Sequence, residues 1–286
     1  DAYYDLLLAR RLAREQRSGL GQAEDFERRT RALQQHGEAS MADVHKAAAL
    51  RARFEQRVAQ AELQARLANG ALASFWTDQV DGELEVVDEL DRPPEPPVEA
   101  GQAPPDVRQL ISRRPELAQL EALQRQYQAE AKAARAELRP QASVVFQYGM
   151  DANRVWVRDR GYAVFVNLDI PLFDWFQSRS RAHQAEYKRT AVLQQAAMAR
   201  RQFSQEYWAA ATRVQSCWRQ ASYARQEMEH SRENLRLARL LFESGEGSAL
   251  DVVTAQINAV DSAVAYHSAL AEYSKAIVDF QVASGK

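Results

Sequence analysis

The longest stretch of the chain without glycine or proline runs from Leu172 to Ser244 and contains 73 residues. Glycine and proline are the residues that most often end a helix. As a single helix the stretch would be roughly 110 Å long, at about 1.5 Å per residue, whereas helices of globular proteins usually have about 8–20 residues. The stretch therefore predicts a coiled coil or a helical tube.

Two other segments place apolar residues alternately three and four apart, the spacing of a coiled-coil seam. The first seam consists of Val44, Ala47, Arg51, Phe54, Val58, Ala61, Ala65, Ala68 and Leu72. The second consists of Leu250, Val253, Ile257, Val260, Val264, His267, Ala271, Ser274 and Val278. Both seams predict long helices packed side by side, and His267 is expected to be a packed core residue.

The segment between these helices is interrupted by proline. Six of the nine prolines lie between Pro93 and Pro105, so residues 75–108 are predicted to form an irregular linker, with one short strand at Leu84–Val87. A further helix is expected from about Glu116 to Leu138. The segments expected along the chain are a helical hairpin at 1–74, the linker at 75–108, a helix at 109–140, a β-hairpin at 141–171 and a long helical hairpin at 172–286.

Residues 141–171 alternate apolar side chains with polar or small ones, which predicts two strands joined by a polar loop. The apolar set is Val144, Phe146, Tyr148, Tyr162, Val164, Val166, Leu168 and Ile170. Two strands joined by one loop are marginal in water. Alternation over about 9–11 residues is typical of a transmembrane β-barrel strand, which would make this set membrane-facing. The alternative is an edge hairpin that packs on a helix.

Two loops of the chain repeat at an offset of 208 residues. Residues 36–47 align with residues 244–255, and six of the twelve aligned positions are identical. Gly37 and Gly245 are each predicted to end a helix. The capping pairs Ser-x-x-Asp that follow are Ser40 with Asp43 and Ser248 with Asp251. Both loops are therefore predicted to be tight turns between antiparallel helices.

The sequence resembles the outer-membrane efflux protein (TolC) family over essentially its whole length. The resemblance lies in Phe-Glu-Ser-Gly-Glu-Gly-Ser-Ala-Leu-Asp-Val-Val-Thr-Ala-Gln at 242–256, in Arg-Pro-Glu-Leu at 114–117, in Ala-Glu-Leu-Arg-Pro-Gln at 136–141 and in Leu-Asp-Ile-Pro-Leu-Phe-Asp at 168–174. Family members are internal duplications with two strand pairs, and this chain has one. The resemblance implies that the first helix and strand pair of the repeat are missing before Asp1.

The resemblance implies a mainly α fold: an α-barrel of long coiled-coil helices in the periplasm, with the hairpin contributing to a transmembrane β-barrel in the outer membrane of a Gram-negative bacterium. The linker falls at the family's equatorial belt. The implied function is the passive exit duct of a tripartite efflux or type I secretion system. Its implied partners are two further copies in a homotrimer, a periplasmic adaptor, an inner-membrane pump and outer-membrane lipid. The alternative is a periplasmic coiled-coil adaptor or scaffold.

The resemblance also assigns roles to the duplicated turns, which match the adaptor-binding tips of the family's helical tube. The matching positions are Gly37, Ser40, Asp43, Val44, Gly245, Ser248, Leu250 and Val252. Asp251 matches an aspartate that lines the gate, and a ring of carboxylates favours cations. Thr254 and Phe242 stand where some members carry a second acid and a latching tyrosine. Asp251 acting only as a helix cap is an alternative.

The sequence offers little support for other classes of function. The 37 Lys and Arg against 39 Asp and Glu give a net charge of −2, which offers no basis for a nucleic-acid partner. The single cysteine, Cys217, excludes an internal disulfide and is expected to be a buried spectator. The histidines lack metal-ligand spacing, and nucleophile or phosphate-loop motifs are missing. The sequence therefore predicts neither an enzyme nor a cofactor.

Overall fold

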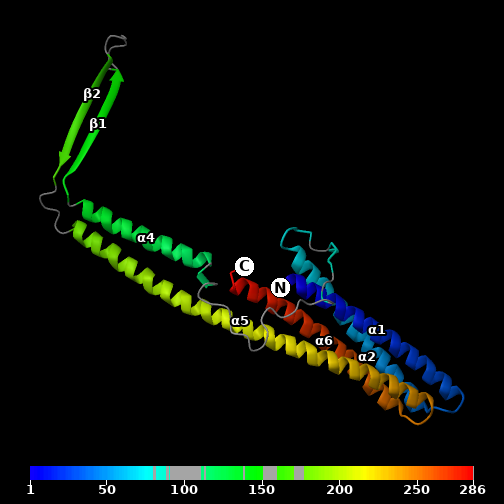
Figure 1. The fold of residues 1–286 in the computed structure, drawn as a ribbon. Coiled ribbons are helices and arrows are strands. Elements are labelled where there is room, and N and C mark those ends of the chain that lie inside the picture. Colours follow the sequence, from blue (N-terminus) through cyan, green and yellow to red (C-terminus); the bar gives the residue numbers. More distant parts are fainter. Residues whose placement is uncertain are drawn as a thin grey trace. The chain divides into compact units, whose positions relative to one another are not determined.

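The computed structural model of the chain describes residues 1–79, 82–87, 90, 111–112, 114–137, 139–150, 160–170 and 177–285. Long helices and a single two-stranded antiparallel sheet make up the regular structure of these residues (Figure 1). The prediction of a mainly α fold with one β-hairpin is confirmed. The chain divides into two compact units, one formed chiefly by residues 1–105 and 206–284 and the other by residues 106–205.

The first unit is a bundle of α1 (Ala2–Gln35), α2 (Met41–Ala73), α6 (Ala249–Ala283) and the C-terminal part of α5 (Gln177–Glu243). In Figure 1, α1 and α2 form an antiparallel pair on which α6 packs. The core cluster of this bundle consists of Ala23, Phe26, Ala47, Leu50, Phe54, Ala249, Val252 and Val260. Its small residues let the helices approach closely: a Cβ on Gly19 would lie 2.8 Å from Phe54 Cε1 and 3.0 Å from Val260 Cγ2.

The buried face of α6 is wider than the predicted seam and is centred one residue earlier. Its buried positions include Val252, Gln256, Ala259, Ala263, Leu270, Tyr273, Ile277 and Phe280. The prediction was wrong for Leu250 and Val278, which are 56% and 38% exposed. The physical reason is that α6 contacts α1 and α2 together, so more than one stripe of the helix is removed from water.

His267 is mostly buried, as predicted, and its Nε2 lies 3.4 Å from Glu15 Oε1 on α1. This contact is the main reason that the pKa of Glu15 lies below its usual value. Nearer the C-terminus of α6, Lys275 binds Asp5 of α1 at 2.7 Å. Polar contacts therefore add to the apolar packing that joins α1 to α6.

Helix α5 is 67 residues long, as the stretch without glycine or proline predicts. Thr190, Ser204 and Thr212 each donate a hydroxyl hydrogen bond to the carbonyl four residues earlier, at 2.8–3.0 Å. Such bonds keep these polar side chains on the helix and often bend it slightly.

The second unit contains α4 (Pro115–Ala136), the N-terminal part of α5 and the strands β1 (Gln141–Met150) and β2 (Arg160–Asp169). Pro115 starts α4, a position where its fixed φ suits a helix. Ion pairs join α4 and the residue after it to α5, among them Arg135 with Glu186 and Arg181 with Glu137 at 3.2 Å.

The linker is described only at residues 75–79, 82–87 and 90, and the rest of residues 75–108 lies outside the described residues. The strand predicted at Leu84–Val87 does not form. The backbone bonds to helix side chains instead: Asn69 accepts from Leu84 N at 3.1 Å and donates to Gly82 O at 2.7 Å, and Arg10 donates to Leu84 O at 2.7 Å. Without a neighbouring strand, these side chains satisfy the polar backbone groups.

Candidate functional site

The two duplicated turns adopt the same local structure. Gly37 and Gly245 both have φ of +80°, a conformation that glycine adopts at little cost. The amides of Gly37 and Glu38 donate to Gln34 O and Leu33 O at 3.0 and 2.9 Å. At the second turn the amides of Gly245 and Glu246 donate to Phe242 O and Leu241 O at 3.1 and 2.9 Å. Each helix therefore ends in the hydrogen-bond pattern of a Schellman motif.

The helix that follows each turn begins with a complete capping box. Ser40 Oγ accepts from the Asp43 amide at 3.2 Å, and the Ser40 amide donates to Asp43 Oδ2 at 3.2 Å. Ser248 and Asp251 make the same two bonds, both at 3.2 Å. These bonds satisfy amides that a helix start leaves without partners. The repeat of sequence is therefore also a repeat of geometry.

The two turns lie together at one end of the first unit (Figure 1). Arg29 of α1 pairs with Glu243 of α5 at 2.6 Å, and also with Asp25 at 2.9 Å. Behind this pair, the rings of Phe26 and Phe242 meet edge to face with centroids 5.3 Å apart. We call this end of the unit, with residues 33–47 and 241–255, the tip region.

Side chains in the tip region divide into buried and exposed sets. Val44 and Val252, at equivalent positions, are 8% and 0% exposed and belong to the packed interior. Leu250 is 56% exposed, and Asp251 and Thr254 are exposed as well. Phe242 is half-buried against Phe26. Of the three residues assigned to a gate by resemblance, two are free to face a neighbouring molecule and one stabilises the bundle.

The two capping carboxylates differ in their surroundings. Asp43 pairs with Lys46 at 3.0 Å, whereas the position equivalent to Lys46 in the second turn is Thr254. Hydrogen bonds from Ser40 and Ser248 hold the pKa of both Asp43 and Asp251 below the ordinary value. Asp251 therefore carries a charge at neutral pH, and no ion pair offsets it within the described residues.

Gly247 makes the second turn tighter than the first. Its amide donates to Leu241 O at 2.8 Å, and a Cβ at this position would lie 2.9 Å from Leu241 Cβ. The equivalent position in the first turn is Ala39. The second turn therefore needs glycine at a place where the first does not.

The hairpin brings the predicted membrane-facing residues to one face. The register pairs Val144 with Val166, Phe146 with Val164 and Tyr148 with Tyr162. All three pairs are well exposed, with Val166 at 72%, and described helices do not cover them. Leu168 shares this face, opposite Ala142, whereas Ile170 lies just beyond the end of β2. The alternative of a hairpin packed on a helix is not what these residues form.

The other face of the hairpin is polar at five of its ten positions and apolar at its centre. Ser143 pairs with Asn167 and Gln141 with Asp169, whereas Val145 pairs with Phe165. A strand pair with one face that is apolar in four of its five cross-strand pairs and one mixed face is typical of a barrel wall that separates lipid from a wetter interior.

A buried polar network behind the tip region was not predicted. Gln256, which is fully buried on α6, donates to Gly19 O of α1 at 2.9 Å. Arg239 of α5 donates to Gln22 at 2.9 Å and to Gln256 at 3.3 Å, and burial lowers its pKa. The network ties three helices together. The only signal for this network in the sequence is that Gln256 directly precedes a position of the predicted seam of residues 250–278.

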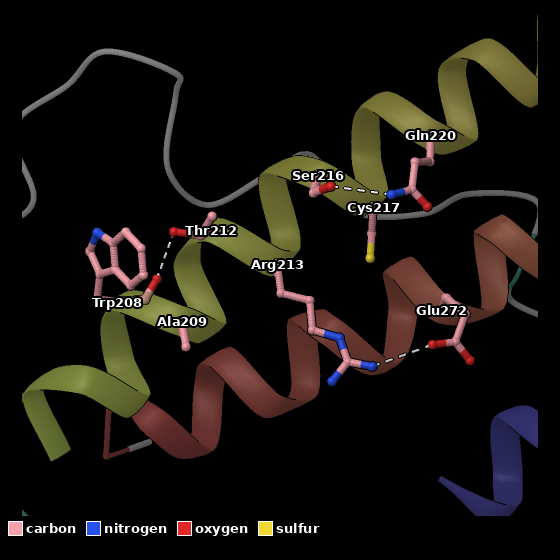
Figure 2. Close-up of a pocket in the computed structure, with 8 residues that line it drawn as sticks. All are labelled: Trp208, Ala209, Thr212, Arg213, Ser216, Cys217, Gln220 and Glu272. Atoms are coloured by element: carbon pink, nitrogen blue, oxygen red, sulfur yellow. Dashed lines mark hydrogen bonds and ion pairs between the residues drawn. The ribbon is translucent and has the colours of Figure 1, made fainter. Parts of the chain in front are cut away.

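A shallow hollow lies farther along α5, where Arg213 points toward Glu272 of α6 (Figure 2). Their closest charged atoms are 3.5 Å apart, and Arg213 also lies 3.6 Å from Asp279. Cys217 lies in this hollow, half-buried, and burial raises the pKa of its thiol. A thiol held in its protonated form is a poor nucleophile. Among the described residues, no group of three or more His, Cys, Asp or Glu is placed to hold a metal ion.

The described helices also contain no segment that is both long and apolar enough to cross a membrane.

The model of the family described as outer membrane efflux protein matches residues 107–286. A search of curated protein sequences finds no significant match.

Several solved structures resemble the chain. A membrane protein from Pseudomonas aeruginosa is 23% identical to this chain, with a TM-score of 0.79. The alignment includes 99% of this chain and 66% of that protein. CusC, whose crystal structures concern folding and transmembrane channel formation, is 16% identical, with a TM-score of 0.81. The alignment includes 99% of this chain and 66% of CusC. The MtrE outer membrane channel of Neisseria gonorrhoeae, in its open state, is 19% identical, with a TM-score of 0.79. The alignment includes 99% of this chain and 64% of MtrE. The chain thus spans slightly less than two thirds of each of these structures.

Proposed function

This chain belongs to the outer membrane efflux protein family, and we propose that its protein is the passive exit duct of a tripartite efflux or type I secretion system. Its location is the outer membrane, with helices in the periplasm. The family consists of channel proteins, not known enzymes. In the proposed system an inner-membrane pump supplies the energy and a periplasmic adaptor joins the pump to the duct. A periplasmic adaptor is the weaker alternative for this chain, because the matched family is one of outer-membrane proteins.

The observation that carries this proposal is the exposed hairpin. Two ten-residue strands present four cross-strand apolar pairs on one face, and no described helix covers that face. Exposed apolar surface of this extent marks a site that something else covers. In the proposed homotrimer, outer-membrane lipid covers the apolar face, and the mixed face lines the barrel through which substrates leave.

The hairpin is tested by adjacent substitutions on opposite faces. Val166→Arg places a cation on the face assigned to lipid, which costs about 2–4 kcal/mol at the middle of a bilayer. Asn167→Arg places the same side chain on the mixed face, so it is the matched control. We expect Val166→Arg to reduce the amount of channel that inserts into planar bilayers, and Asn167→Arg to insert normally with altered ion selectivity. Equal insertion of both variants would refute the assignment of faces.

The tip region is the proposed gate and adaptor-binding end. Asp251 and Thr254 are exposed there, and three copies of Asp251 around a trimer axis would form a ring of carboxylates that binds cations. Phe242 is assigned to the gate as the residue that holds the end of α5 in place against Phe26. The exposed positions of the two turns, Leu250 among them, are the proposed contacts for the adaptor.

The gate is tested by separating the charge of Asp251 from its capping role. Asp251→Asn removes the charge, whereas Ser248→Ala removes the serine half of the capping box and leaves the carboxylate. In single-channel recordings we expect divalent cations to block the Asn variant less strongly than the original protein, and to block the Ala variant as before. Unchanged block in Asp251→Asn, or equal loss of block in both variants, would leave Asp251 as a helix cap only.

A further inference from the structure

One exposed face of α2 lacks charged side chains. From residue 56 to residue 71 its positions follow each other at intervals of three or four, and they are Gln56, Gln60, Leu63, Leu67 and Ala71. We call these five residues the outer α2 face. Leu63 and Leu67 are 45% and 57% exposed. A helix face in water normally carries charged side chains, whereas the centre of a protein interface is depleted in them. The outer α2 face therefore has the composition of a surface that another molecule covers.

Helices α2 and α5 contact different sides of α6. Arg57 of α2 pairs with Asp261 at 2.6 Å, whereas the ring of Trp218 on α5 lies against Tyr273, with centroids 5.1 Å apart. Asp261 and Tyr273 are separated by about three and a third helical turns, so they point in different directions from the axis of α6. The first unit thus has α2 and this part of α5 on separate sides of α6.

The same contacts show which parts of α2 and α5 are level with each other. Both α2 and α6 run away from the duplicated turns, so equal numbers of residues beyond the pair of Arg57 and Asp261 lie at about equal height. Tyr273, and Trp218 that contacts it, are then level with about residue 69 of α2. The part of α5 around Trp218 is therefore level with the apolar end of the outer α2 face.

At this level α5 and α6 form the hollow of Figure 2, which has a volume of about 500 Å³. Small side chains of α5 line much of it, namely those of Ala209, Ser216 and Cys217. Glu272 of α6 lies 3.5 Å from Arg213 and offsets its charge. Small side chains and balanced charge leave room for uncharged side chains from another molecule.

We propose that the outer α2 face of one copy packs into this hollow of the next copy, with Leu67 and Ala71 against Cys217. The inference rests on the proposed homotrimer. Copies related by an axis along their helices meet at equal levels, and a contact between two different surfaces on separate sides of one copy can close into a ring. The exposed leucines of α2 are then removed from water, which stabilises the contact.

Cysteine cross-linking tests this interface, because Cys217 is the only cysteine of the chain. In Ala71→Cys the new thiol lies near Cys217 of the neighbouring copy. Oxidation by copper phenanthroline in air should therefore convert the purified protein, in a nonionic detergent, to covalent dimers and trimers. Gln56→Cys is the matched control, since it lies on the same face about 22 Å nearer the turn and should stay monomeric on a denaturing gel.

Two results of this experiment would overturn the interface. One is that Ala71→Cys cross-links no more than Gln56→Cys. The other is that cross-linking of Ala71→Cys persists when Cys217→Ser is added, because α2 would then pack on α2 of another copy. A protein that inserts and conducts as an exit duct but fails this test keeps its proposed function and loses only the interface.

A charge on the outer α2 face gives an independent measurement. Leu67→Glu alters a side chain that is 57% exposed, so each copy should still fold, and the trimer should be lost in sedimentation velocity in detergent. Gln64→Glu is the matched control, because Gln64 is exposed on the same helix beside the face, and this variant should stay trimeric. If both variants sediment as the original trimer, the outer α2 face does not hold the copies together.

Discussion

At Gly19, α1 lies close to both α2 and α6, so adding one methyl group there has a predictable effect. In Gly19→Ala the new Cβ would lie 2.8 Å from Phe54 Cε1 and 3.0 Å from Val260 Cγ2. Ordinary contacts between carbon atoms are about 3.5–4.0 Å, so the neighbours would have to move by several tenths of an ångström. Phe54 is fully buried, so a shift of its ring would disturb close-packed neighbours.

Two opposing contributions decide the size of the effect. Replacing glycine by alanine inside a helix stabilises a protein by roughly 0.5–1 kcal/mol. Overpacking a close-packed core costs about 1–3 kcal/mol. Gly21→Ala is the matched control, because a Cβ on Gly21 meets no heavy atom within 4 Å. The free energy of unfolding of Gly19→Ala should therefore be about 1–3 kcal/mol lower than that of Gly21→Ala.

The assay is equilibrium unfolding in urea, followed by circular dichroism at the helix band, at one protein concentration for all variants. Phe54→Leu in the Gly19→Ala background tests the cause, since it removes the ring edge that the new methyl group would strike. The two substitutions should be less destabilising together than the sum of their separate effects. If Gly19→Ala proved as stable as Gly21→Ala, the close approach of the three helices at this point would be refuted.

Further predictions concern single contacts. Ser40→Ala and Ser248→Ala should each lower the free energy of unfolding by about 1 kcal/mol, because each removes a helix cap, and unchanged urea midpoints would contradict this. The pKa of Asp251 is lower in the folded protein than its ordinary value. The charged Asp251 carboxylate therefore contributes its full stabilisation at a pH above the ordinary pKa, and this stabilisation is lost as the pH falls through the lowered pKa. The difference in melting temperature between the original protein and Asp251→Asn should therefore narrow at acidic pH, and a constant difference would argue against the cap. In His267→Ala the pKa of Glu15, followed by carbon NMR, should rise toward its ordinary value, since the contact with His267 is the largest cause of its lowering; an unchanged pKa would show that the two side chains do not interact.

Features set by local sequence were predictable. A stretch without glycine or proline gave a 67-residue helix, and Ser-x-x-Asp after glycine gave a capped turn at both copies. Strict alternation predicted two strands, and the predicted apolar side chains within them, from Val144 on β1 to Leu168 on β2, share one face. Such features depend on a few neighbouring residues, so one sequence suffices to predict them.

Features that depend on how helices meet were not predictable in the same way. The heptad positions of α6 identified Val260 and Ala271 as buried, but they missed Val252 and Gln256 because α6 packs on α1 and α2 together. The strand expected at Leu84–Val87 failed for a similar reason. Asn69 and Arg10, which are distant in sequence, take the hydrogen bonds that a neighbouring strand would have made.

The free edges of the hairpin have a consequence for how the protein matures. Among the described strands, β1 and β2 pair only with each other, so the outer edge of each keeps a row of unpaired amide and carbonyl groups. Such edges recruit further strands, and a two-stranded sheet has little stability of its own. The contacts within the helical bundle all lie in one polypeptide, whereas the described residues offer the two edges of the sheet no further strand. Where those strands come from other copies of the polypeptide, the final stage of folding is a collision between molecules, and its rate rises with their concentration.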